Sequence, residues 1–447
     1  MNITTITIRS TNYQKGTKMK EFDKVVGYKS VKLELERIID MMINPDNYRS
    51  LGVKTTRGLL LYGEPGVGKT LMSKCFIEAS KRKTFTLRKD TPDGDFVKMI
   101  KKTFDNAKEA APSIVFLDDM DKFANEDSDH EDTEEYVTIQ ACIDDVKDYE
   151  VFVIATANNI CKLPKSLLRA GRFDKNIEIE NPKGEDVGEI VKYYLNSKVL
   201  SDDIDYKEIA RLLDGKSCAA LETVINEAGV YAGFEKHESI SMNDIVRAFM
   251  RVVYDAPEAE SYNYGKHLHS IAVHEAGHAL VSEVLEPGSV TLATVKKHDG
   301  GSTGGFVSYQ NDDDYFESMS YMENRVRACL AGKAATEVVY GQIDVGANSD
   351  LHRAFSIVGR FVDSYCGYGF GFWEGETDRE ESQVVANRKA QLIQTEMERY
   401  YQQTKRIIIE NREFLDRLTE ALVARKVLVY KDIQNIKAGC TIKGASC

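Results

Sequence analysis

Gly63-Glu-Pro-Gly-Val-Gly-Lys-Thr70 is the stretch of sequence that decides the fold of the first half of this chain. It fits the pattern G-x-x-x-x-G-K-[ST], in which backbone N–H groups cradle phosphates, the lysine reaches the terminal phosphates and the hydroxyl holds Mg²⁺. The motif lies between an apolar run and a helical pattern, as phosphate binding requires. The predicted nucleotide-binding residues of this loop are Gly63, Glu64, Pro65, Gly66, Val67, Gly68, Lys69, Thr70 and Leu71.

Short apolar runs alternate with helical patterns on both sides of this loop. Near-continuous hydrophobic strands separated by helices indicate a parallel sheet covered on both faces. We therefore predict an α/β domain with a parallel five-stranded sheet, with phosphate bound at the carboxyl edge of that sheet. The five runs span residues 58–62, 84–87, 113–117, 151–155 and 176–179.

An acidic pair follows the third of these runs. Asp118 comes directly after Ile114-Val-Phe-Leu117, at the end of a strand that the sequence predicts to be buried. A carboxylate at this place can support the Mg²⁺ ion of a bound nucleotide. Asp118 alone would equally suit a helix cap after a strand, and its pairing with the phosphate loop favours the metal-supporting role.

The second half of the chain carries a different signature, His274-Glu-Ala-Gly-His278, which fits the pattern H-E-x-x-H. On a helix, two histidines four residues apart share one face and can reach one zinc ion. Glu275 can then act as the general base for water that the metal activates. Tetrahedral zinc needs a third protein ligand, and composition alone does not locate it.

The overall composition narrows the class of partner and compartment. The formal net charge of −12 over 447 residues argues against a nucleic-acid partner, since such binding depends on Lys and Arg neutralising phosphates. Eight cysteines stand singly with no C-x-x-C pair, which suits a reducing compartment. No apolar run is long enough for a membrane span. We expect a cytoplasmic, soluble protein.

The patterns divide the chain into five segments. A polar N-terminal segment (1–20) precedes the α/β domain (21–182), and a small helical lid (183–252) follows it. A linker (253–265) leads to a mainly α-helical domain (266–447) that contains one hairpin-like interruption from Val290 to Tyr309.

The order of four blocks in the first half resembles the AAA+ ATPases: GEPGVGKT, IVFLDDMD, VIATANN and LLRAGRFD. This resemblance implies that Asn158 is the sensor that orients the attacking water. It also implies that Arg169 and Arg172 reach the nucleotide of a neighbouring subunit, where a cation stabilises transition-state charge. Surface ion pairing is the alternative for these arginines. An arginine that reaches the nucleotide of a neighbouring subunit is called an arginine finger, and it implies a homo-oligomer. This family forms hexameric rings.

Residues 271–352 resemble the peptidase domain of the FtsH family, the AAA+ zinc proteases. The matching blocks are Ile271-Ala-Val-His-Glu-Ala-Gly-His278, Leu330-Ala-Gly-Lys-Ala-Ala335 and Gly346-Ala-Asn-Ser-Asp-Leu351. The resemblance implies that the third zinc ligand, beside His274 and His278, is Asp350. His352 is a weaker rival for this role. The similarity runs from about Phe22 to the C-terminal helices, and implies Zn²⁺ and ATP with Mg²⁺ as cofactors.

Three departures from the family pattern bear on mechanism. Members of the family usually begin with membrane-spanning segments, and none is predicted here. The hydrolytic glutamate that follows the magnesium aspartate in the family is replaced by Asp119, which is shorter by one methylene. A misplacement of about 1 Å can cost on the order of a hundredfold in rate. The substrate-gripping loop, Lys89-Asp-Thr-Pro-Asp-Gly-Asp95, lacks the usual aromatic, and we predict Phe96 to be a core residue rather than its substitute.

These features predict an ATP-dependent zinc endopeptidase that delivers unfolded or tagged polypeptide substrates to a ring of zinc sites. Asp119 and the altered loop leave open a nucleotide-gated peptidase with weak ATP turnover. An ATP-driven remodeller with an idle zinc site is a third alternative, which the presence of Glu275 disfavours.

Overall fold

The computed structural model describes residues 19–89, 95–124, 133–169, 171–256, 267–297, 304–310, 318–342, 347–365 and 383–444. The chain forms two compact units. The first comprises Met1–Tyr193 with Gly215–Glu222, and the second comprises Tyr194–Asp214 with Thr223–Cys447.

The first unit is built on the predicted five-stranded parallel sheet. Its strand order is β2-β3-β4-β1-β5, and every pairing is parallel. The central strands β3 and β4 are buried along their whole length, which explains their uninterrupted apolar sequence. The sequence prediction of an α/β fold is confirmed. The strands are β1 (Gly58–Tyr62), β2 (Lys83–Leu87), β3 (Ser113–Leu117), β4 (Val151–Ala157) and β5 (Lys175–Glu178).

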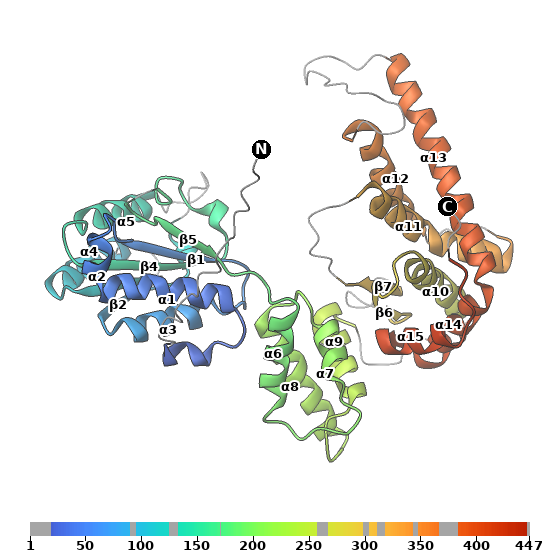
Figure 1. The fold of residues 1–447 in the computed structure, drawn as a ribbon, viewed down its shortest axis with the longest axis horizontal. Coiled ribbons are helices and arrows are strands. Elements are labelled where there is room, and N and C mark those ends of the chain that lie inside the picture. The colour runs from blue at the N-terminus through green and yellow to red at the C-terminus, as the bar shows by residue number, and fades with distance from the viewer. Residues whose placement is uncertain are drawn as a thin grey trace, which may run out of the picture. The chain divides into compact units, whose positions relative to one another are not determined.

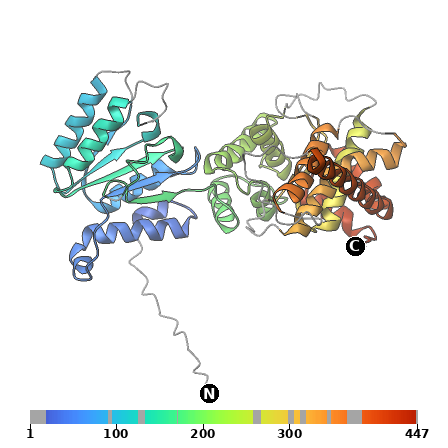
Figure 2. The ribbon, with the colours of Figure 1, turned by 90° about the horizontal axis from the view of Figure 1, so that it is seen from above.

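Helices cover both faces of this sheet (Figures 1 and 2). Helix α3 (Lys69–Ser80) packs against β1 and β4, with α1 (Lys29–Ile43) on its outer side. Helix α4 (Asp95–Glu109) packs against β2 and β3 and pairs with α5 (Thr133–Asp145). The remaining short helices of this region are η1 (Lys20–Lys24), α2 (Pro45–Arg49), η2 (Met120–Lys122) and η3 (Ile160–Lys162).

Four helices follow the sheet: α6 (Glu185–Leu195), α7 (Tyr206–Leu212), α8 (Cys218–Phe234) and α9 (Met242–Tyr254). Asp205 caps the N-terminus of helix α7, and its carboxylate accepts hydrogen bonds from the N–H groups of Lys207 and Glu208. Helix α9 begins with a capping box between Ser241 and Asp244. Such caps satisfy the free N–H groups of a first turn. Tyr254, which the sequence prediction placed in the linker (253–265), is instead the last residue of α9.

The C-terminal part of the second unit is mainly helical, as predicted. Its helices are α10 (Leu268–Leu285), α11 (Met319–Tyr340), α12 (Asn348–Asp363), α13 (Gln383–Glu410), α14 (Arg412–Arg425) and α15 (Tyr430–Ala438). The predicted hairpin is present as β6 (Val290–Thr294) paired antiparallel with β7 (Phe306–Tyr309). A third strand, β8 (Val427–Val429), pairs with the other side of β6 and was not predicted.

Helix α10 lies at the centre of this part of the unit. It packs against α11, α14 and β6, and eleven of its eighteen residues are buried. The helix is therefore apolar all round, because it is enclosed by other elements instead of lying at a surface. The polar side chains that this helix does carry are held inside the fold, and they include the H-E-x-x-H residues.

Candidate functional site

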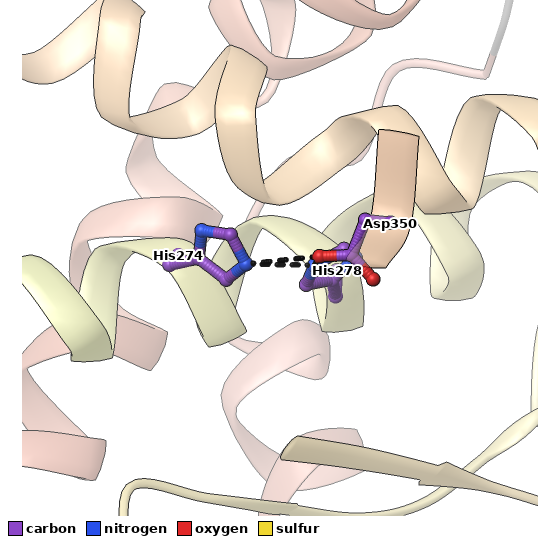
Figure 3. Close-up of side chains that lie close together, drawn as sticks. All are labelled: His274, His278 and Asp350. Carbon is purple, nitrogen blue, oxygen red and sulfur yellow. Dashed lines mark hydrogen bonds and ion pairs between the residues drawn. The ribbon is translucent and has the colours of Figure 1, made fainter. Parts of the chain in front are cut away.

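The two histidines of the second motif meet Asp350 at one point (Figure 3). His274 and His278 lie on consecutive turns of α10, and Asp350 lies in the first turn of α12. The Nε2 atoms of the histidines are 3.1 Å apart. The Oδ2 atom of Asp350 is 3.3 Å from Nε2 of His274 and 3.4 Å from Nε2 of His278. His352, the rival ligand, is exposed.

This arrangement fits a zinc ion. Nitrogen and oxygen ligands of zinc lie about 2.0–2.1 Å from the metal, so neighbouring ligand atoms of a tetrahedral site are about 3.3 Å apart. The three observed separations match that spacing on all sides of the triangle. His278 Nδ1 lies 2.7 Å from the carbonyl oxygen of Ala328, which can only accept. Nδ1 therefore carries the proton, and Nε2 offers its lone pair to a metal.

Burial and charge set the protonation of the acids in this site. Burial alone would raise the pKa of Asp350, but the neighbouring imidazoles of His274 and His278 outweigh it and hold this pKa well below its usual range. Asp350 is therefore a carboxylate, as a metal ligand must be. Glu275 lies beside the ligands and is almost fully buried. Burial raises the pKa of Glu275 to about 8, so its carboxyl group is poised to take up and release a proton.

Two glycines leave room for α11 and the start of β7 to pack against His274 and Glu275. Neither glycine was identified as a site residue from the sequence. Gly332 of α11 faces His274, and a Cβ atom there would lie 2.5 Å from Cε1 of the imidazole. Gly305 precedes β7, and a Cβ atom there would lie 2.8 Å from Cγ and 3.0 Å from Oε1 of Glu275. Gly332 belongs to the quoted block Leu330–Ala335, and Gly305 to the glycines at the hairpin. Both glycines are visible in the sequence, but their importance depends on which helix and strand approach His274 and Glu275.

The phosphate loop has the backbone that its sequence predicts. It connects β1 to α3, and Gly66 and Gly68 adopt positive φ angles of 84° and 100°. The ammonium of Lys69 is buried and donates hydrogen bonds to the carbonyl oxygens of Gly63 (2.8 Å) and Glu64 (2.7 Å). Burial also lowers the pKa of Lys69. The lysine is thus held inside the loop.

The acids after β3 connect to this loop. Asp118 Oδ1 lies 3.4 Å from Oγ1 of Thr70 and accepts a hydrogen bond of 2.8 Å from Oγ1 of Thr156. The same Thr156 oxygen accepts the backbone N–H of Asp119 at 2.9 Å. Thr156, on β4, was not singled out from the sequence. It fixes both acids beside the residues that would hold Mg²⁺.

Asp119 is paired with cations. Its Oδ2 atom lies 2.7 Å from Nζ of Lys122 and 3.8 Å from an Nη atom of Arg88. Its backbone is left-handed, with φ 55°, a conformation that aspartate tolerates better than most residues. Asn158, the predicted sensor, follows β4 directly and is partly buried.

Two family models match the chain. Residues 59–181 match the ATPase family associated with various cellular activities (AAA), and residues 264–436 match Peptidase family M41. The ATP-dependent zinc metalloprotease FtsH 2 of Symbiobacterium thermophilum is 32% identical over 438 residues, which cover 93% of this chain and 74% of that protein. FtsH of Thermus thermophilus is 28% identical over 451 residues, covering 94% and 71%.

The chain belongs to the FtsH family. Its coverage of some relatives is lower, at 62% of FtsH 2 of Phytoplasma mali. The chain is thus an enzyme with an ATPase and a zinc peptidase domain, whose cofactors are Zn²⁺ and ATP with Mg²⁺. Membership also indicates an oligomeric ring that acts on protein substrates. This supports the first of the three functions predicted from the sequence.

The two arginines compared with the FtsH finger region differ in their surroundings. Arg169 is exposed. Arg172 donates from Nε and Nη2 to the two carboxylate oxygens of Asp144 (3.1 and 2.7 Å), and from Nη1 to the carbonyl oxygen of Ser166 (2.6 Å). The Arg172 guanidinium lowers the pKa of Asp144 to about 2. Arg172 therefore has partners within its own chain, whereas Arg169 faces outward.

Most of the loop compared with the FtsH substrate-gripping segment, residues 90–94, lies outside the described residues. Phe96 is described and is buried, with its ring against that of Phe123 at 5.2 Å between centroids. The prediction that Phe96 is a core residue is confirmed. No helix among the described residues is long and apolar enough to cross a membrane.

Proposed function

We propose that this FtsH-family enzyme hydrolyses peptide bonds with Glu275 as its general base, and that His274, His278 and Asp350 hold the zinc ion. The convergence of these three ligand atoms at tetrahedral spacing beside a buried carboxyl group carries the proposal. A structural zinc site would not need Glu275, because its fourth position is taken by a ligand instead of water.

The hydrolytic step follows from the arrangement of these side chains. A bound Zn²⁺ supplies Lewis-acid activation of the carbonyl and the water. Glu275 accepts a proton from the attacking water on a carboxylate oxygen and passes it to the departing amine nitrogen. The elevated pKa of Glu275 suits both halves of that transfer. His278 keeps its orientation through the Ala328 carbonyl.

A polypeptide suits this site because a strand borders it. The sheet order among the described residues puts β7 at an edge, and β7 begins directly after Gly305, where a Cβ atom would lie 2.8 Å from Cγ of Glu275. An extended peptide can add to such an edge through main-chain hydrogen bonds. We therefore propose unfolded or tagged polypeptides as substrates, bound in extended form.

The ATPase half is proposed to act in a hexameric ring. Residues 63–71 and Asp118 hold ATP with Mg²⁺, Asp119 and Asn158 place the attacking water, and Arg169 reaches the nucleotide of the neighbouring subunit. The exposure of Arg169 supports that role, and the pairing of Arg172 with Asp144 supports a role in shaping the finger loop. The five-segment division predicted above and a cytoplasmic location are kept as parts of this proposal.

Two activities, each measured with and without ATP, test this proposal. Degradation of an unfolded protein and cleavage of a short peptide are compared for the wild type, Glu275→Gln and Asp119→Asn, with and without ATP. We expect Glu275→Gln to abolish both activities, with a loss of about a thousandfold, while it keeps zinc and ATP hydrolysis. We expect Asp119→Asn to stop protein degradation and spare peptide cleavage. A wild type that cleaves neither substrate refutes the proposal.

A further inference from the structure

The helical lid contacts the peptidase sheet within the second unit at two places. The first involves Arg211 of α7. Its Nη2 atom donates to the carbonyl oxygens of Gly288 and Val290, the latter at 3.4 Å, at the start of β6. The guanidinium also lies 3.8 Å from the ring centroid of Tyr430, a cation–π contact. An ion pair of 3.0 Å between Asp205 and Lys431 stands beside it.

The second contact involves Tyr254, the last residue of α9. Its ring packs on that of Phe306 at 4.4 Å between centroids, and meets the ring of Phe249 edge-on at 5.5 Å. Its hydroxyl donates to Oγ of Ser308 at 3.1 Å. Burial raises the pKa of this phenol, so it stays a neutral donor at all ordinary pH values. The side chain of Tyr254 therefore contacts two residues of β7, Phe306 and Ser308, which are two positions apart and so share one face of the strand.

Strand β7 continues directly into the catalytic site. Gly305 precedes Phe306, and the Cβ position of Gly305 lies 3.0 Å from Oε1 of Glu275. A shift of β7 would therefore change the packing of Gly305 against Glu275. It would also move the sheet edge to which a substrate strand would add. Errors of about 1 Å at a reacting group cost on the order of a hundredfold in rate.

We propose that Tyr254 is a positioning residue for peptide-bond hydrolysis: it holds β7 against Glu275, and through it the lid controls the peptidase site. This inference rests on the proposed function of Glu275. Tyr254 acts through β7, whose residues Phe306 and Ser308 it contacts.

The lid is also attached to the nucleotide loop. In the first turn of α8, the N–H of Ala219 donates to the carbonyl oxygen of Gly66 at 3.0 Å. Near its other end, Glu235 pairs with Arg247 of α9 at 2.7 Å, and Tyr231 lies under the same guanidinium at 4.8 Å. Helix α9 ends at Tyr254. Helix α8 thus begins at a contact with the phosphate loop and ends near a contact with α9, the helix that carries Tyr254.

The test compares Tyr254→Ala, Tyr254→Phe and the control Tyr206→Phe in the full-length chain. Tyr206 lies on α7 of the same lid, with its side chain partly exposed. Amide hydrogen exchange of residues 304–310 and steady-state cleavage of a short peptide are measured with ADP and with a non-hydrolysable ATP analogue. Hydrogen exchange requires neither catalysis nor zinc, so it directly measures how often the backbone hydrogen bonds of β7 open.

In the wild type, we expect the analogue to change both the exchange of β7 and kcat for the peptide. Tyr254→Ala should speed exchange by about tenfold, lower kcat by about tenfold with little change in KM, and remove the response to nucleotide. ATP hydrolysis should be kept. Tyr254→Phe retains the ring packing and loses the hydrogen bond to Ser308, so its exchange rate and kcat should lie between those of the wild type and Tyr254→Ala. Tyr206→Phe should match the wild type.

Two results would overturn the inference. The first is wild-type exchange of β7 in Tyr254→Ala, and the second is a wild type whose β7 exchange is the same with either nucleotide. Failure of the proposed function is distinct, because it appears as a wild type that cleaves no peptide while its β7 amides still respond to nucleotide and to Tyr254→Ala.

Discussion

The zinc site and the nucleotide site of this chain differ in how far they are assembled by the folded chain itself. At the zinc site, two helices bring three ligand atoms to within 3.1–3.4 Å of one another. At the nucleotide site, the corresponding charges are engaged with the protein: Lys69 with two loop carbonyls, and Asp119 with Lys122.

The difference follows from where the side chains are attached. His274, His278 and Asp350 are on helices packed in a core, so burial fixes their rotamers before any metal binds. Lys69 is the first residue of α3 and Asp119 lies between β3 and η2, so both follow strands at the carboxyl edge of the sheet, where their charged groups are paired with nearby protein groups. The peptidase half is thus preorganised, whereas the ATPase half must exchange partners during its cycle.

The strongest way to break this contrast is to disturb the packing that preorganises the zinc site. Gly332→Ala places a Cβ atom against the imidazole of His274. We expect zinc affinity to fall by about a hundredfold, and proteolysis to fall with it, while ATP binding is kept. Zinc content after dialysis against a graded chelator measures the effect.

Gly359→Ala is the matched control for that change. Gly359 lies within α12, and a Cβ atom there meets nothing within 4 Å. This variant should keep its zinc and gain up to about 1 kcal/mol of stability from helix propensity. Wild-type zinc affinity in Gly332→Ala would show that the helices can adjust, and that the site is less rigid than its geometry implies.

At the nucleotide site, a substitution is expected to increase activity instead of reducing it. Asp119→Glu adds one methylene, which carries the carboxylate beyond the position that Lys122 holds at 2.7 Å. We expect ATP hydrolysis to rise by about tenfold if reach limits the wild type. Phosphate release at saturating ATP measures it, with the exposed Asp145→Glu as control. A slower variant would mean that Asp119 already stands at the productive distance.

A smaller effect is expected at Glu283, which supports the zinc helix from its C-terminal side. Its carboxylate is buried and accepts from Gly288 N–H, Val290 N–H, Gln434 and Lys437. Burial alone would raise the pKa of Glu283, but these donors outweigh it and lower that pKa below its ordinary value of 4.5. Glu283→Gln should cost about 2 kcal/mol of stability at pH 7.

The sign of its pH dependence follows from that lowered pKa. The stabilisation by Glu283 is fully present above the pKa of the unfolded chain, and it is lost as pH falls through the lower pKa of the folded protein. Urea unfolding at a series of pH values should therefore show the gap between wild type and Glu283→Gln closing below about pH 4.5. The exposed Glu420→Gln serves as control. If the difference in unfolding free energy between the wild type and Glu283→Gln stays constant with pH, Glu283 stabilises the protein through packing and not through its charge.

Much of the architecture could be predicted from local patterns. The five apolar runs became five strands because buried parallel strands need uninterrupted apolar sequence. The two histidines were certain to share a helix face, and the resemblance to FtsH supplied Asp350. Phe96 was correctly placed in the core.

What escaped prediction depends on contacts between distant segments. Gly332 and Gly305 matter because a helix and a strand approach His274 and Glu275, and no local pattern reveals that approach. Strand β8 is three residues long and is defined only by its pairing with β6. Tyr254 was assigned to the linker because of the polar composition that follows it, and its role is visible only through its contact with Phe306.

Helix α8 runs without interruption from Cys218 to Phe234. At 1.5 Å per residue it is a rod of about 25 Å. If the rod tilts by about 10° at its first turn, its far end moves by roughly 4 Å. Such leverage would turn a displacement smaller than one phosphate group at Gly66 into a movement of several ångströms where α8 meets Arg247.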